Sequence, residues 1–253
     1  MSPLFISMGT FALVFGGAVL GIYVSPLLPV HQPSSESKDI VRLGMGLVAT
    51  TVAVVLGLLV SSAKSFYDTQ SNEVTQLAAN VVMLDRILAH YGPEATDART
   101  ALRTVLGNQL QSPQSRDPSN KVYSAITSGT RVGDGLIDKI QDLSPKEDNQ
   151  RSMKAQALSM AFQLGQTRWL MFEQNAVPVP RLLLVMLILW LIVLFLSFAI
   201  FAPRNLMVIV GLFMAAVAVC GAILLILEMY HPQTGLIRVS DAPLRAALTQ
   251  LGR

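Results

Sequence analysis

Apolar residues in this chain gather in four stretches, each long enough to cross a lipid bilayer. A hydrocarbon core about 30 Å thick needs about 20 apolar residues in a helix. The four stretches are Leu4 to Val24, Val41 to Ser62, Pro180 to Ala202 and Leu206 to Met229. The pattern therefore predicts an all-α membrane protein with four transmembrane helices.

The second stretch continues without a Gly-Pro break into a polar segment with helical spacing. Apolar side chains recur there every three or four residues up to Tyr91, and Gly92-Pro93 follows. Proline removes a backbone donor and disfavours helical backbone in the preceding residue. We therefore expect one helix that runs from lipid into water and ends at Tyr91.

The chain between the second and third spans shows helical periodicity and no alternation typical of strands. We expect a helix over Glu94 to Gln111, a loop over Ser112 to Asn120 and a weaker helix over Lys121 to Leu143. Ser144 and Pro145 suit the cap and first position of a long helix that leads to the third span.

The predicted organisation has four segments. Residues 1–62 hold the first two spans, 63–177 form a helical region inserted between spans two and three, 178–230 hold the last two spans, and 231–253 form a C-terminal tail. Leu244, Ala247, Leu248 and Leu251 predict a short amphipathic helix in that tail.

The composition of the spans predicts how they pack. Gly17 and Gly21 in the first span have the small-xxx-small spacing that lets two helices approach closely. The fourth span contains several small residues and is expected to be buried, whereas the uniformly bulky third span is expected to face lipid. The small residues of the fourth span include Gly211, Ala215, Ala218 and Gly221.

Charge distinguishes a membrane protein from a nucleic-acid-binding protein here. The chain is 52% hydrophobic and 14% charged, too apolar for an ordinary soluble domain, and its formal net charge is +3. From Lys64 to Glu173 it has twelve basic and twelve acidic residues, so the excess lies beside the spans. We therefore expect a lipid bilayer as partner and no nucleic acid.

The basic residues also predict an orientation. Four spans place both termini and the large region on the same side, and that side carries more Lys and Arg near the span ends. By the positive-inside rule it is cytoplasmic, in a multi-pass protein of the inner membrane. The residues on this side are Lys64, Arg168, Arg181, Arg238, Arg245 and Arg253, against Lys38, Arg42 and Arg204.

Enzyme signatures are lacking. His31, His90 and His231 lie in separate segments, and the single cysteine, Cys220, lies in the last span. The sequence has no HExxH, no GxxxxGK[ST] and no GxSxG. We expect neither catalysis nor a metal site nor a cofactor.

Asp85 and Arg86 are the sharpest charged feature of the long helix. As an ion pair they could form a gate or a ligand contact, or they could order a helix surface. The second interpretation is favoured because ion pairs at helix surfaces are usually architectural.

The second span carries two overlapping lines of small side chains. Ala49, Ala53, Gly57, Ser61 and Ser65 recur every four residues, a pattern typical of close helix packing. Thr50, Val54, Gly57, Ser61 and Lys64 form a weakly polar line that suits the lining of a narrow pore. Periodicity alone favours packing.

Two long blocks of the sequence resemble a known family. They are VLGLLVSSAKSFYDTQSNEVTQLAANVVMLDRILAHYGPEATDARTALR and GLIRVSDAPLRAAL, and they are similar to bacterial membrane proteins that share a bestrophin-like domain. The resemblance implies a distant relation to bestrophins, which are oligomeric anion channels with four membrane helices per subunit and a pore lined by the second helix. It therefore implies self-association and inorganic anions as partners.

The chain departs from animal bestrophins at two points. Their acidic calcium-binding cluster has no counterpart beyond Glu147-Asp148, and their bulky neck is replaced here by Val54, Leu58 and small residues up to Phe66. The sequence supports two hypotheses. The first is a homo-oligomeric ion channel for anions with the second span lining the pore, and the second is a non-conducting scaffold or sensor that binds a partner through its cytoplasmic helical bundle.

Overall fold

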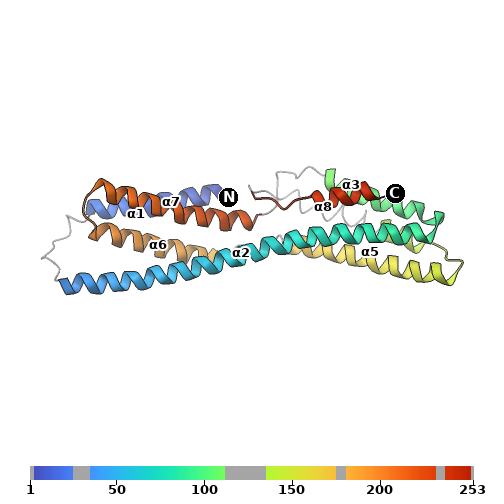
Figure 1. Cartoon of the computed structure of the whole chain (residues 1–253), viewed down its shortest axis with the longest axis horizontal. Helices are drawn as coiled ribbons and strands as arrows, with labels where there is room; N and C mark the ends of the chain where they lie inside the picture. Colours follow the sequence, from blue (N-terminus) through green and yellow to red (C-terminus); the bar gives the residue numbers. More distant parts are fainter. Residues whose placement is uncertain (1–2, 25–34, 112–134, 175–180, 232–236, 252–253) are drawn as a thin grey trace. The chain divides into compact units, whose positions relative to one another are not determined.

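The computed structural model describes residues 3–24, 35–111, 135–174, 181–231 and 237–251, and all regular secondary structure within them is helical (Figure 1). The predicted all-α class is confirmed. The elements are α1 (Pro3–Val24), α2 (Ser35–Tyr91), the 3-10 turn η1 (Pro93–Ala95), α3 (Thr96–Gln111), a helix over 135–141, α5 (Asp148–Gln174), α6 (Arg181–Phe201), α7 (Leu206–Met229) and α8 (Ala242–Gln250).

Four of these helices are long and apolar enough to cross a membrane, as the sequence predicted. They are α1, α2, α6 and α7. The chain divides into two compact units, the first made of Met1–Asp68 and Pro178–Arg238 and the second of Thr69–Val177 and Val239–Arg253. The helix α2 contributes residues to both units, while the four-segment organisation and the inserted region stay predictions.

In the first unit, α1 packs against α6 and α7. A Cβ atom on Gly21 would lie 2.9 Å from the Cβ of Ala199 and 3.1 Å from the carbonyl oxygen of Leu196, so only glycine allows this approach of α1 to α6. The aromatic rings of Phe11 and Phe15 contact that of Phe213 on α7 at centroid distances of 5.7 and 5.5 Å. The expected close packing of the first span is therefore present.

The third and fourth spans are each buried on part of their surface only. In α6, Leu187 and Leu191 are buried while Leu182 and Val185 are exposed. In α7, Ala216 is buried while Gly211, Ala215 and Ala218 are exposed, so each predicted role holds for part of its helix. Both large and small side chains therefore fill the interior of this unit, as Leu187 of α6 and Ala216 of α7 show.

The second unit has a core of its own. Leu84 and Leu88 of α2, Leu102 of α3 and Ile140 are buried, and Leu244 of α8 joins them. This confirms the helical face predicted for the C-terminal tail. The amphipathic pattern of α8 thus serves packing inside the second unit.

The helix α2 ends at Tyr91, as predicted, because Gly92 has φ 127° and ψ −177°. That backbone region is essentially restricted to glycine. The start of α2 was placed too late, since the helix begins at Ser35 and not at Val41. Serine is favoured at helix starts and an acidic residue such as Glu36 suits the first turn, so the polar residues before the apolar span already belong to the helix.

The helix α5 begins later than predicted. It starts at Asp148, and Ser144-Pro145 lies before it in irregular backbone. Lys154 explains the difference, because its Nζ donates to the carbonyl oxygens of Gln141 at 2.6 Å and Leu143 at 2.8 Å. These hydrogen bonds satisfy carbonyl groups at the end of the preceding helix. The segment that the proline pattern had assigned to α5 therefore connects the two helices instead. The predicted loop over Ser112–Asn120 and most of the predicted helix after it lie outside the described residues.

Candidate functional site

The part of α2 in the first unit buries one side only. Met45, Val52, Leu59 and Ala63 are its buried apolar residues, with exposed fractions of 9% or less. Their spacing of seven and then four residues places them on one side of the helix. This side fixes how α2 packs against its own unit.

The opposite side of α2 carries the residues predicted to line a pore. Thr50, Val54, Gly57, Ser61 and Lys64 are all exposed. At 3.6 residues per turn they fall within a sector of about 80°, roughly opposite the buried side. We call these five residues the exposed face of α2.

No described residue of the chain covers this face at its centre. Val54 is 57% exposed, and a Cβ atom on Gly57 would meet no other atom within 4 Å. Of the further residues in the predicted packing line, Ala53 and Ser65 are exposed and Ala49 is half-buried. The small residues therefore do not serve close packing within one chain, and both roles predicted for this surface stay predictions.

The hydroxyl groups near the face are held by the helix itself. Thr50 Oγ1 donates to the carbonyl oxygen of Gly46 at 2.9 Å, and Thr51 Oγ1 donates to that of Leu47 at 3.0 Å. A hydroxyl that donates to the preceding turn presents only its acceptor side outward. An anion would therefore have to draw Thr50 away from this bond before receiving a proton from it.

The one cation of the exposed face is balanced. Lys64 Nζ forms an ion pair with the carboxylate of Asp68, one turn further along α2, and about half of each side chain is exposed. The sequence placed a fixed positive charge at the end of the predicted pore line. In the structure the net charge at this position is close to zero.

Aromatic side chains attach α2 to the end of α7 where its apolar part finishes. The hydroxyl groups of Ser62 and Tyr230 are 3.1 Å apart, the rings of Phe66 and Tyr230 lie 5.4 Å apart, and Tyr67 donates to the carbonyl oxygen of Arg238 at 3.2 Å. These contacts fix the rotation of α2, and with it the direction of the exposed face. Sequence reasoning missed them, although aromatic residues at span ends are a known anchoring signal.

In the second unit, Asp85 has a different partner from the one expected. Its carboxylate accepts two hydrogen bonds from Arg99 of α3, from Nε at 2.7 Å and from Nη2 at 2.9 Å. Asp85 is buried, and its hydrogen bonds raise the pKa of the Arg99 guanidinium. Arg86 is exposed and takes no part in this pair. Neighbours in sequence point about 100° apart on a helix, which explains why Arg86 was the wrong partner.

The turn after α2 holds further polar contacts. Gln150 of α5 donates to the carbonyl oxygen of Tyr91 at 3.0 Å, and its own amide oxygen accepts the backbone N–H of Lys146 at 2.8 Å. Hydrogen bonding by its own backbone N–H and by Lys146 lowers the pKa of Glu94. The hydroxyl group of Tyr91 is buried without a hydrogen-bond partner among the described residues, and burial raises its pKa.

Within the described ranges, no three His, Cys, Asp or Glu side chains come together as ligands of an ion. The single cysteine, Cys220, is buried in α7, where its backbone carbonyl accepts a hydrogen bond from Ser7 at 3.0 Å. The exposed face of α2 differs from the exposed small residues of α7 because it also carries the polar side chains of Thr50, Ser61 and Lys64.

Comparison with known proteins places this helical arrangement in a family. A model of the bestrophin-like domain matches residues 12–244 of the chain. The chain belongs to the bestrophin-like family. The resemblance seen in the sequence is thereby confirmed, and among curated proteins no match was found.

Crystal structures share the fold of this bestrophin-like protein. One of a bacterial bestrophin homologue from Klebsiella pneumoniae has a TM-score of 0.71 at 16% sequence identity, with 96% of each chain covered. A single-substitution variant of a Klebsiella pneumoniae homologue gives 0.70 at 16% identity, with 96% of this chain and 97% of that chain covered. At such identity the likeness concerns the fold of nearly the whole chain.

Proposed function

We propose that this bestrophin-like protein is a homo-oligomeric membrane ion channel, selective for anions, in which the exposed face of α2 lines the pore. One observation carries the proposal. From Thr50 to Lys64, the side of this membrane-spanning helix opposite its buried side is mostly small and weakly polar, and no described residue of the chain covers it at its centre. Lipid would favour bulky apolar side chains there, whereas a water-filled path favours this composition.

Several copies of the chain are needed to build such a path. One copy supplies one face, and a closed ring of copies would turn the faces toward a common axis. Large apolar side chains elsewhere on the spans, such as Leu182 at 75% and Met207 at 86% exposed, suit contact with lipid. The distribution of Lys and Arg favours insertion in the inner membrane with both termini in the cytoplasm.

Selectivity for anions is proposed from the membership of the bestrophin-like family, because the charge of the exposed face is itself balanced. The exposed face lacks carboxylates down to Asp68, where Lys64 balances the charge. Removing one full charge about 4 Å from a passing ion changes its energy by ~1 kcal/mol in water. In an oligomer, Asp68→Asn would leave Lys64 unbalanced, which lowers the energy of an anion and raises that of a cation by about this amount each. The anion-to-cation permeability ratio should therefore rise about 30-fold.

The test is recording from purified protein in planar bilayers. Reversal potentials under a salt gradient give the permeability ratio for the natural protein and for Asp68→Asn. Asp148→Asn is the matched control, because Asp148 also pairs with a basic side chain, Arg151, but belongs to α5. Absence of any conductance would refute the channel. A ratio unchanged by Asp68→Asn would refute the place of Lys64 in the path.

A second candidate function is a non-conducting scaffold or sensor, and an exposed surface of α5 favours it. Phe162 is 56% exposed, Trp169 58% and Leu170 46%, in a unit where Met83 is the one other exposed large apolar side chain among the described residues. Such side chains suit a protein partner. Cross-linking from position 162 in native membranes would distinguish the two, since a scaffold is expected to capture another protein and a channel to capture only copies of itself.

A further inference from the structure

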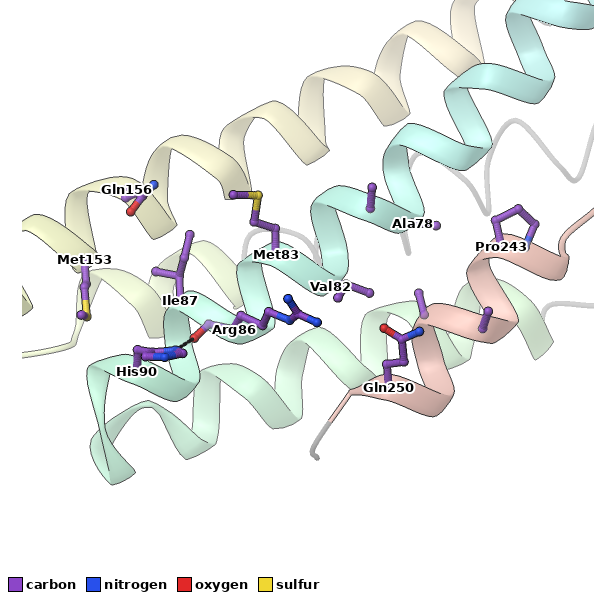
Figure 2. A pocket seen from close by; sticks show the side chains of 13 residues that line it. Ala78, Val82, Met83, Arg86, Ile87, His90, Met153, Gln156, Pro243 and Gln250 are labelled. Carbon is purple, nitrogen blue, oxygen red and sulfur yellow. Dashed lines mark hydrogen bonds between the residues drawn. The ribbon is translucent and has the colours of Figure 1, made fainter.

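An open groove of about 690 Å³ lies in the second unit between α2, α5 and α8 (Figure 2). Pockets for small molecules usually measure about 300–1,000 Å³ and combine an apolar lining with a few polar groups. The size and lining of this groove fit that description. It is built entirely from residues of the second unit.

Two rows of side chains on α2 form its floor. Ala78, Val82 and Arg86 recur every four residues, and Met83 and Ile87 stand in the neighbouring row. Figure 2 shows Met83 and Ile87 pointing toward α5 and the guanidinium of Arg86 directed toward Gln250 of α8. The remaining walls include Met153 and Gln156 of α5 and Pro243, Ala246 and Ala247 of α8.

Arg86 is the one permanently charged side chain among the described residues that line the groove. Its sequence neighbour Asp85 is engaged by Arg99 through two hydrogen bonds and is turned into the unit. No carboxylate of the described residues lies within ion-pair distance of Arg86. The nearby His90 ring donates from Nδ1 to the carbonyl oxygen of Arg86 at 2.8 Å, since a carbonyl oxygen only accepts.

We propose that this groove binds a small monocarboxylate with an apolar tail. The Arg86 guanidinium presents a planar pair of donors that matches a carboxylate, and the polar side chain of Gln250 lines the groove on the side toward which Arg86 points. The tail lies on Val82, Ile87 and Ala246. The proposal concerns a ligand site in the second unit and does not depend on the pore assigned to α2.

A second copy of the chain fits this groove less well. The exposed apolar side chains of α5 lie within residues 162–170, and that segment contains no Asp or Glu. Its insertion would place apolar groups against a guanidinium without supplying a carboxylate. A small amphiphilic anion satisfies the cation and the apolar walls together.

The test measures binding of 11-(dansylamino)undecanoic acid to the full chain in nanodiscs of neutral lipid, with empty nanodiscs as background. We expect saturable binding of one probe per chain, displaced by dodecanoate and not by dodecanol. Adding phosphatidylglycerol to the discs should leave the affinity unchanged, because the site takes a free carboxylate and not a lipid headgroup. Arg86→Gln should weaken binding about tenfold or more, as loss of a charge-assisted hydrogen bond predicts.

Matched variants keep the result interpretable. Arg103→Gln removes another exposed arginine of the same unit outside the groove and should bind normally. Ala246→Trp fills the groove from an exposed position and should abolish binding without unfolding the unit. The proposal is overturned if the probe shows no saturable binding, if Arg86→Gln and Arg103→Gln behave alike, or if Ala246→Trp leaves binding intact. It is also overturned if Ala246→Trp changes the oligomeric state, since the groove would then be a contact between copies.

Discussion

The helix α2 behaves differently in the two units to which it contributes. In the first unit it buries one side and leaves Leu43, Leu47 and Leu58 exposed by 76%, 71% and 66%, together with the small exposed face. In the second unit Met83 is its one exposed large apolar residue among those described, and it lines the ligand groove. The second part of α2 buries or half-buries its other large apolar side chains within its own unit, whereas the first part leaves many of its own exposed.

The difference follows from the solvent around each part. In water, burial of apolar side chains drives α2, α3, α5 and α8 to form a closed core. In lipid that driving force between helices is absent, because the hydrocarbon tails are as apolar as leucine. A membrane helix can therefore leave a face unfilled, and selection can use that face for conduction.

The largest effect is expected from filling the exposed face. Gly57→Trp places an indole in space that one chain leaves open, so a single copy should fold normally, but an oligomeric pore should be blocked. We expect the ionic current in planar bilayers to fall to background. Gly44→Trp is the control, since Gly44 is equally open and points about 140° away on the helix. Equal currents for the two variants would contradict the pore.

The second unit should respond to the loss of a buried charge. Breaking a buried pair typically costs about 3–5 kcal/mol, because the remaining charge is left without a partner. Asp85→Ala should therefore destabilise the second unit strongly and leave the first unit intact. Hydrogen exchange of α3 in the whole protein measures the effect, with Asp148→Ala as an exposed control. Equal exchange in both variants would show that the pair with Arg99 contributes little.

A smaller effect is expected from two tyrosines with opposite surroundings. Tyr91 buries a hydroxyl without a partner among the described residues, so Tyr91→Phe should raise stability by about 1 kcal/mol. Tyr67 donates to Arg238, so Tyr67→Phe should lower it by about 0.5–1 kcal/mol. Thermal unfolding of the two variants measures both effects. The same sign of change in both would contradict the hydrogen bonding described for the two hydroxyl groups.

The pKa of Tyr91 adds a pH dependence to this comparison. Burial raises it, so the folded state keeps the phenol proton more firmly than the unfolded state does. The contribution of the neutral Tyr91 side chain to stability is therefore fully present below the ordinary tyrosine pKa of about 10 and is lost as pH rises above it. The melting temperature of the natural protein should fall more steeply above pH 10 than that of Tyr91→Phe.

The sequence predicted those features that depend on local pattern. Span lengths, the continuous helix through Ser62 and Lys64, and its end before Gly92 all follow from hydrophobicity and backbone chemistry. The pairing of Asp85 with Arg99 depends on how α3 folds back after the glycine turn, which no local pattern reports. The exposure of the small residues on α7 depends likewise on which of several apolar faces fills the interior.

Local sequence pattern also did not decide in which direction the exposed face of α2 points. Small residues every four positions suit both close packing and a pore. The buried side of α2, with Val52 and Leu59, shows that the exposed face points away from the core of its own unit. Whether copies turn this face toward an axis is a property of the oligomer.

Chemical access to two adjacent threonines tests the central claim most directly. Thr50 and Thr51 are both exposed and bonded to the preceding turn, but only Thr50 lies on the exposed face. In a Cys220→Ala background, Thr50→Cys and Thr51→Cys would be treated with a charged, membrane-impermeant thiosulfonate during bilayer recording. We predict rapid modification and loss of current at position 50 and no change at position 51. Equal reactivity at the two positions, or modification without any change in current, would contradict the assignment of α2 as the pore-lining helix.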